Sequence, residues 1–125
     1  MYTVSVRRDF VARHYLIGGE WGDENNPHAH DYTVEIRLQG NRLNKQGFLV
    51  DIVEVEKQLN LEVGNYENAV LNDLAEFAGI NPSLEHFAKV ICSRLSVQFH
   101  DFGLSSLEVR LWESKKAWAS FRQEY

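Results

Sequence analysis

The sequence predicts an α+β fold in which two helices cover one face of a four-stranded antiparallel sheet. Three observations lead to this prediction. Apolar and polar residues alternate in two stretches near the start of the chain, apolar residues recur every three or four positions in the middle, and alternation returns near the end. The expected order is therefore strand, strand, helix, helix, strand, strand (ββααββ), with residues 1–125 forming one domain.

The first two strands are predicted from period-two alternation. The first is expected within residues 2–16, and the second from His30 onwards. Between them, residues 17–27 (IGGEWGDENNP) are rich in glycine, asparagine and aspartate, which predicts a loop. The side chains expected to face the helices are Val4, Val6, Phe10, Ala12 and His14 in the first strand, and Tyr32, Val34, Ile36 and Leu38 in the second.

The first helix is predicted to begin at Asp51, which forms a capping-box pattern with Glu54. Gly64 is the expected stop, because glycine is common just past the last turn of a helix. The buried stripe of this helix is expected from Ile52, Val55 and Leu59.

The tripeptide NPS predicts the start of the second helix. Asn81 or Ser83 is the expected N-cap, and Pro82 is suited to the first turn. Cys92 lies beside its apolar stripe, so a small buried thiol is expected there. The stripe consists of Leu84, Phe87, Ala88, Ile91, Leu95 and Phe99.

A terminal hairpin is predicted from the renewed alternation at the end of the chain. Glu113 continues the inward series of its first strand, so its carboxylate is expected at the edge of the buried face, where it needs a partner. That partner is either a ligand with adjacent N–H donors, such as a pterin or guanine, or a lysine or arginine of the chain. The apolar series of the hairpin are Leu107, Val109 and Leu111, then Ala117, Ala119 and Phe121.

Composition narrows the class of protein. The chain has a net charge of −5, which gives no general attraction to nucleic acid or to anionic membranes. No apolar run approaches the roughly 20 residues that span a bilayer, and the first residues lack the apolar region of a signal peptide. Cys92 is the only cysteine, which excludes an internal disulfide and fits a reducing compartment. We therefore expect a soluble cytoplasmic protein.

Three histidines form a candidate metal site. His28 and His30 are two residues apart on a strand or its approach, so they project to the same side. His14 ends the inward series of the first strand, and a hairpin would bring it back beside them. Three neutral imidazoles with one open position are typical of catalytic zinc. The alternative is that each is an ordinary surface or packing residue. For His86 and His100, which have no such arrangement, we expect surface or capping roles.

Five short motifs in order resemble the family of 6-pyruvoyl-tetrahydropterin synthases and 6-carboxy-tetrahydropterin synthases across nearly the whole chain. They are F-x-A-x-H (residues 10–14), H-x-H (28–30), V-D (50–51), P-S-x-E-x-x-A (82–88) and W-E-S (112–114).

This resemblance implies the tunnelling fold, in which three subunits join their sheets into a barrel and two such trimers stack as a hexamer. It implies a Zn²⁺ ion and a pterin substrate. The zinc ligands that match are His14, His28 and His30, and the substrate-binding residues that match are Glu113, Glu85 and Phe10.

Two departures from the family pattern concern the groups that move protons. Where family members carry a cysteine before the H-x-H pair, this chain has Glu24, which resembles a variant that converts dihydroneopterin triphosphate to 6-hydroxymethyl-dihydropterin. Where they carry an Asp-His pair, it has Glu67 and Asn68. A third, milder change puts Ala29 between the paired histidines.

Three hypotheses follow for function. The first is a zinc-dependent lyase on a dihydropterin side chain, with Glu24 as base and Glu67 as a weaker candidate. The second is a catalytically altered or inactive zinc protein that binds a pterin or purine. The third is a structural oligomer in which the histidines only tie two strands together.

Overall fold

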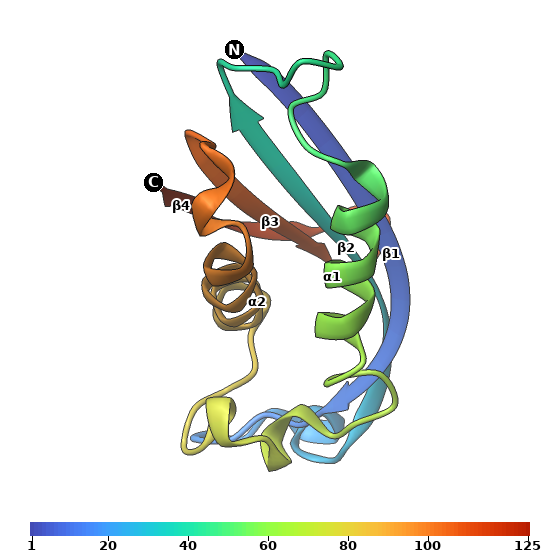
Figure 1. Cartoon of the computed structure of the whole chain (residues 1–125). Helices are drawn as coiled ribbons and strands as arrows, with labels where there is room; N and C mark the ends of the chain where they lie inside the picture. The colour runs from blue at the N-terminus through green and yellow to red at the C-terminus, as the bar shows by residue number, and fades with distance from the viewer.

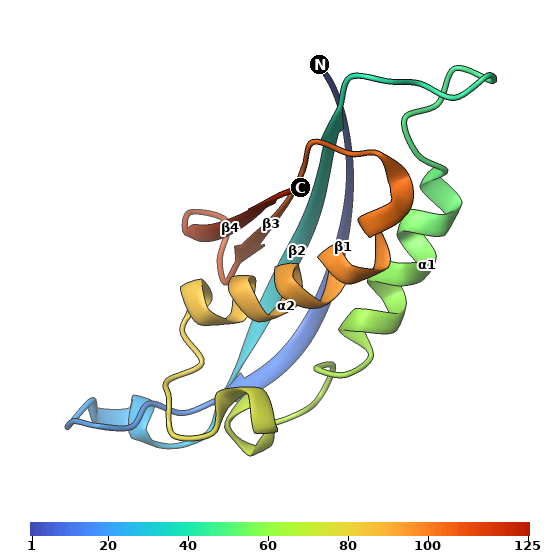
Figure 2. The same ribbon diagram turned by 60° about the vertical axis from the view of Figure 1, so that its left-hand side comes forward.

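The computed structural model describes residues 1–125, and its strands form one antiparallel sheet in the order β1-β2-β3-β4. Both long helices lie on the same face of this sheet (Figures 1 and 2). The predicted α+β class and the order ββααββ are therefore confirmed. The elements are β1 (Tyr2–His14), η1 (Gly22–Asn25), β2 (His28–Gly40), α1 (Ile52–Val63), η2 (Leu71–Asp73), η3 (Ala75–Phe77), α2 (Leu84–Gln98), η4 (His100–Phe102), β3 (Ser106–Trp112) and β4 (Trp118–Glu124).

The β1–β2 hairpin is longer than the β3–β4 hairpin, and this difference makes room for a site. β1 and β2 pair along their whole length, from Tyr2 opposite Gly40 to His14 opposite His28. β3 pairs with β2 only as far as Thr33 opposite Trp112. The last residues of the long hairpin therefore extend past the end of β3, and they arch beneath the start of α2 (Figure 1).

The core lies between the sheet and the two helices, and Phe87 of α2 is at the centre of its aromatic part. Four rings pack edge-on against Phe87 with centroid separations of 5.0 to 5.9 Å. Such pairs contribute about 0.5–1.5 kcal/mol each beyond the burial of their area. The four rings belong to Phe10 and Tyr32 of the long hairpin, and to Tyr66 and Phe77 of the segment between the helices.

Three details of the first helix test the sequence reasoning. Asp51 caps α1 as predicted, because its carboxylate accepts the Val53 N–H at 3.0 Å. The predicted capping box does not form, because the Glu54 carboxylate accepts a hydrogen bond from the Gln58 side chain instead. The prediction that Ile52 is buried is also wrong, because this side chain in the first turn of the helix is 50% exposed. The buried stripe consists of Val55, Leu59 and Val63, with Glu62 beside them.

The second helix is capped by Ser83, whose hydroxyl accepts the His86 N–H at 3.1 Å. Pro82 therefore precedes the cap, and the prediction that it belongs to the first turn is wrong. Cys92 is buried as expected, and burial raises the pKa of its thiol to about 11. Neither helix is long and apolar enough to cross a membrane.

The sheet face opposite the helices is polar, yet its side chains pack closely. Glu35 is only 6% exposed, accepts a hydrogen bond from the Ser5 hydroxyl and lies 3.9 Å from Arg7. Its Oε1 atom has no hydrogen-bond partner. Arg7 also lies 4.8 Å over the ring of Trp112. Glu35 therefore lies on the face away from the helices, but this face is not simply solvated.

Candidate metal and ligand site

The three histidines singled out from the sequence meet at the far end of the long hairpin. Their rings are 4.6 to 4.9 Å apart between centroids, and one possible ligand atom from each lies within 4.8 Å of the others. The strand register explains this, because His14 is paired directly with His28, and His30 is two residues further along the same face. We call these three residues the histidine cluster.

Backbone carbonyls orient two of the three rings. Nδ1 of His14 lies 3.2 Å from the Pro82 carbonyl oxygen, and Nδ1 of His28 lies 2.9 Å from the Asn26 carbonyl oxygen. A carbonyl can only accept, so each Nδ1 carries a hydrogen, and in the neutral form of the ring the lone pair is on Nε2. Metal-binding histidines in proteins are held in the same way.

The protonation state of His14 also suits the binding of a cation. Burial lowers the pKa of His14 to about 4, and the neighbouring His30 and His28 act in the same direction. The Pro82 carbonyl and the carboxylate of Glu24 oppose this shift. His14 is therefore neutral at pH 7 and can donate a lone pair. A set of imidazole nitrogens of this kind fits a divalent transition-metal ion.

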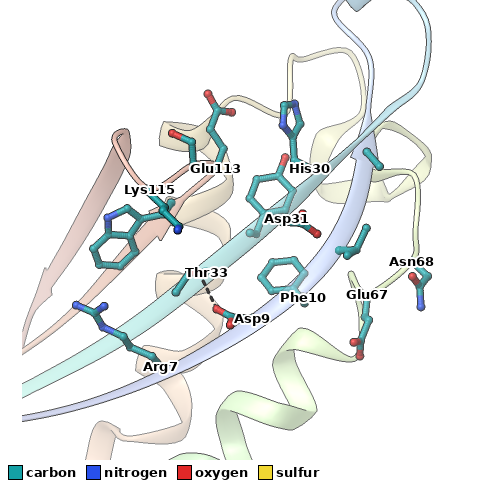
Figure 3. A pocket seen from close by; sticks show the side chains of 15 residues that line it. Arg7, Asp9, Phe10, His30, Asp31, Thr33, Glu67, Asn68, Glu113 and Lys115 are labelled. Carbon is teal, nitrogen blue, oxygen red and sulfur yellow. Dashed lines mark hydrogen bonds between the residues drawn. The ribbon is translucent and has the colours of Figure 1, made fainter.

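A pocket of about 1010 Å³ lies beside the cluster, where the long hairpin extends past β3. Figure 3 shows His30 and Glu113 at one end of it and Arg7 at the other. We call it the sheet-end pocket. Its lining consists of Arg7, Asp9, Phe10, Val11, Ala29, His30, Asp31, Tyr32, Thr33, Glu67, Asn68, Trp112, Glu113, Ser114 and Lys115.

Glu113 follows directly after β3 and is half-buried at the pocket wall. It forms no ion pair with Lys115 or Lys116, the alternative that the sequence left open. Its charge is felt by Tyr32, whose pKa is raised first by burial and then by this carboxylate. The carboxylate of Glu113 thus has no partner from the chain, and the residue is part of the pocket lining (Figure 3).

The other two predicted contacts for a substrate differ from each other. Phe10 lines the pocket, is 4% exposed and stacks on Tyr32 at 5.3 Å between ring centroids. Glu85 is exposed in the first turn of α2 and does not line the pocket. Its predicted contact therefore has no counterpart within the pocket of one chain.

The two carboxylates considered as bases also have different surroundings. Glu24 lies in η1, exposed to solvent, and is near enough to affect the pKa of His14. Glu67 lines the pocket, but its carboxylate is 3.0 Å from the guanidinium of Arg8. Asn68 beside it has a left-handed backbone with φ of 61°, a conformation that asparagine tolerates well.

Several pocket residues are not recognisable in the sequence. Arg7 and Arg8 look like ordinary surface charge there, yet one lines the pocket and the other holds Glu67. Asp9, which accepts the Thr33 hydroxyl at 2.6 Å, belongs to no motif. Arg7 and Asp9 have the outward parity and Arg8 the inward parity, all in the middle of the predicted strand, so no local signal marks them as pocket residues.

Known proteins with a similar sequence or a similar fold were found for this chain. A 6-carboxy-5,6,7,8-tetrahydropterin synthase of Bacillus subtilis is 31% identical over 96 residues, which are 72% of this chain and 64% of that protein. The 6-pyruvoyl tetrahydropterin synthase structure from Caenorhabditis elegans superposes with a TM-score of 0.77 at 20% identity, covering 99% of this chain and 98% of that one.

A third likeness is to a 6-pyruvoyltetrahydropterin synthase of Plasmodium vivax, solved as a variant in which a glutamate described as a catalytic residue is replaced by cysteine. It superposes with a TM-score of 0.78 at 14% identity, with both chains covered completely. These neighbours share the tunnelling fold with this chain. The sequence model described as 6-pyruvoyl tetrahydropterin synthase matches residues 3–124. The chain therefore belongs to the 6-pyruvoyl tetrahydropterin synthase family.

Proposed function

We propose that the protein is a zinc-dependent lyase that cleaves the side chain of a dihydropterin and leaves 6-hydroxymethyl-dihydropterin. The observation that carries this proposal is the histidine cluster at the wall of a pocket that also contains the free carboxylate of Glu113. Family membership supports a pterin as the ligand, since the related proteins are named as tetrahydropterin synthases.

The binding roles follow from the surroundings of each group. His14, His28 and His30 would hold the zinc ion, which supplies a Lewis acid for oxygen atoms of the side chain. Glu113 would accept hydrogen bonds from adjacent N–H groups of the pterin ring, because its carboxylate has no partner within the chain. Phe10, stacked on Tyr32, gives the pocket an apolar wall for the planar ring.

Glu24 is the proposed base. Cleavage between the first two carbons of the side chain needs a base that takes the proton of the second carbon's hydroxyl group. The electrons of the broken carbon–carbon bond then go to the carbon attached to the ring, which takes up a proton to become the hydroxymethyl group, and the other fragment leaves as an aldehyde. The Plasmodium vivax protein gives a precedent for a glutamate as catalytic residue in this fold. Glu67 is the weaker candidate, since Arg8 already occupies its carboxylate.

A second candidate function is a zinc protein that binds a pterin or purine without turning it over. The observation that favours it is the pair Glu67–Asn68, which stands where the family carries an Asp-His pair. An amide cannot take up a proton as an imidazole does. In this case the histidine cluster and Glu113 would bind the ligand, but no group would complete the chemistry.

We further propose that the protein assembles as a trimer or as a hexamer of two trimers. In one chain the outer edge of β4 and most of the outer edge of β1 are unpaired, and only Arg13 forms a bridge beyond β1, with Val70. Unpaired edges of this length are unfavourable in isolation, and closing a barrel removes them. Light scattering at micromolar concentration should give the mass of three or six chains, and a strictly monomeric protein would contradict this.

The function is tested by incubating zinc-loaded protein with dihydroneopterin triphosphate, with its dephosphorylated form and with related dihydropterins. Mass spectrometry then identifies the products. We expect 6-hydroxymethyl-dihydropterin from at least one of these compounds. Tight binding without any product would favour the second candidate, and neither binding nor product would reject both.

A further inference from the structure

The segment of residues 15–27, which we call the site loop, connects the histidine cluster to Glu24. It leaves β1 after His14 and returns to β2 at His28. Apart from the single turn of η1 it has no regular structure, and from residue 18 onwards it is exposed. A segment of this kind is expected to be mobile unless hydrogen bonds fix its backbone.

Two asparagine side chains hold the first part of the site loop. Asn72 accepts the Tyr15 N–H at 2.9 Å and donates to the Tyr15 carbonyl at 2.9 Å. Asn81 does the same to Ile17, at 2.7 and 3.2 Å. Each amide therefore matches both groups of one residue, as a neighbouring strand would. Tyr15 and Ile17 are two residues apart, so alternate residues are held from the same side.

Hydrogen bonds within the site loop connect its first part to Glu24 and Asn25. The Leu16 N–H donates to the carbonyl of Glu24 at 2.8 Å, so the residue between the two held positions is bonded directly to the backbone of the proposed base. Asn25 accepts the Trp21 N–H at 2.7 Å and donates to the carbonyls of Leu16 and Gly19 at 3.1 and 3.0 Å. The position of Glu24 thus depends on where the first part of the loop is held.

The short segment that contains Asn81 also contacts the histidine cluster. Pro82, the residue after Asn81, places its carbonyl 3.2 Å from Nδ1 of His14. The dipeptide Asn81–Pro82 therefore contacts both a ring of the cluster and the loop that carries Glu24. Since Asn72 and Asn81 are both half-buried, the peptide groups they hold have limited access to water as a substitute partner.

We propose that Asn72 and Asn81 are positioning residues, which hold the site loop in register with the histidine cluster and thereby fix the place of Glu24. This inference rests on the proposed function where it concerns catalysis, but the register of the loop can be measured without it. An error of about 1 Å in the place of a reacting group can reduce turnover by roughly 10²-fold.

The test compares Asn72→Leu and Asn81→Leu with Asn44→Leu as a matched control. Leucine has the same branched shape as asparagine but makes no hydrogen bonds. Asn44 also accepts two backbone N–H groups, those of Gln46 and Phe48 at 3.0 Å each, but in the loop after β2, at the opposite end of the molecule (Figure 1). Asn72→Asp and Asn81→Asp keep the acceptor and lose the donor, and they serve if a leucine variant does not fold.

Loop order is read first, from zinc-loaded protein containing 5-fluorotryptophan. Trp21 lies in the site loop, whereas Trp112 and Trp118 lie on the sheet and act as internal references. We expect the ¹⁹F resonance of Trp21 to shift or narrow in both site variants, with amide exchange in residues 16–24 faster by about tenfold or more. The Asn44 variant should change neither.

Turnover is read second. We expect kcat to fall roughly 10–100-fold in the site variants, with KM changed by less than about threefold, because the ligand contacts are intact. An unchanged Trp21 resonance and unchanged exchange rates in both variants would overturn the proposal, as would an equal loss of kcat in the control. If wild type turns over no dihydropterin, the proposed function is wrong, and the loop measurements alone decide whether the asparagines hold the register.

Discussion

The histidine cluster and the carboxylates around it differ in how firmly one chain holds them. The cluster lies on two fully paired strands, with two of its rings oriented by backbone carbonyls. Glu24 lies on an exposed loop and Glu113 just past the end of a strand, and Glu67 is bound to Arg8. The strand register thus builds the candidate metal site, whereas the groups proposed for ligand recognition and proton transfer lie on segments that strand pairing does not fix.

The comparison predicts the largest effect for the cluster. Purified wild type should contain about one zinc per chain. His28→Ala should lose most of this zinc and nearly all turnover, because two imidazoles hold the ion too weakly. His86→Ala is the matched control, since His86 also has its Nδ1 near a carbonyl, that of Asn81 at 2.9 Å, but lies outside the cluster. Elemental analysis checks both, and equal zinc in the two variants would refute the ligand assignment.

The next effect concerns proton transfer. Glu24→Gln should reduce kcat by roughly 10²–10⁴-fold, the usual contribution of a general base, and should leave pterin affinity nearly intact. Glu20→Gln in the same loop is the control, because Glu20 is exposed as well and has no role in the proposed chemistry. Normal turnover by the Glu24 variant would remove the base from the lyase proposal and favour a binding protein.

A smaller effect is expected for ligand recognition. Glu113→Gln should weaken pterin binding by about 2–4 kcal/mol, because it replaces a charged acceptor of two N–H groups by an amide. Zinc content should not change, which separates this variant from those of the cluster. Isothermal titration with a pterin measures the change, and unaltered affinity would show that the ring is anchored elsewhere.

The smallest effect is on the stability of metal-free protein. The pKa of His14 is lowered from 6.5 to about 4 in the folded chain, so the unfolded chain binds more protons between these values. The free energy of unfolding should therefore fall as the pH drops from 6.5 to about 4, and His14 should contribute nothing to this dependence above that window. Urea denaturation in the presence of chelator tests this. His14→Gln should flatten the slope, and a slope unchanged by the substitution would exclude His14 as its source.

The same contrast explains how much of the molecule can be predicted from its sequence. Parity within a strand and the length of a hairpin are local properties, and they are enough to place His14, His28 and His30 together from the sequence alone. The pair Arg8–Glu67 joins residues 59 positions apart, and no local pattern reveals it.

The composition of the rest of the pocket lining depends on where the pairing between β2 and β3 ends. Asp9 and Trp112 line it because β3 ends opposite Thr33, and the alternation of apolar residues does not state that end point. Asn81 shows a related difficulty, since its sequence context indicates only a helix cap. Ser83 takes that role, and the amide of Asn81 holds Ile17 instead, which only the folded chain reveals.

The central claim is tested most directly by rapid-quench product analysis on zinc-loaded wild type and Glu24→Gln, each mixed in excess with dihydroneopterin triphosphate. We predict that wild type releases 6-hydroxymethyl-dihydropterin and a two-carbon aldehyde that carries the triphosphate. The Glu24 variant should bind the same compound and leave it intact over that time. Equal product from both proteins, or release of inorganic triphosphate with the carbon skeleton intact, would contradict the account.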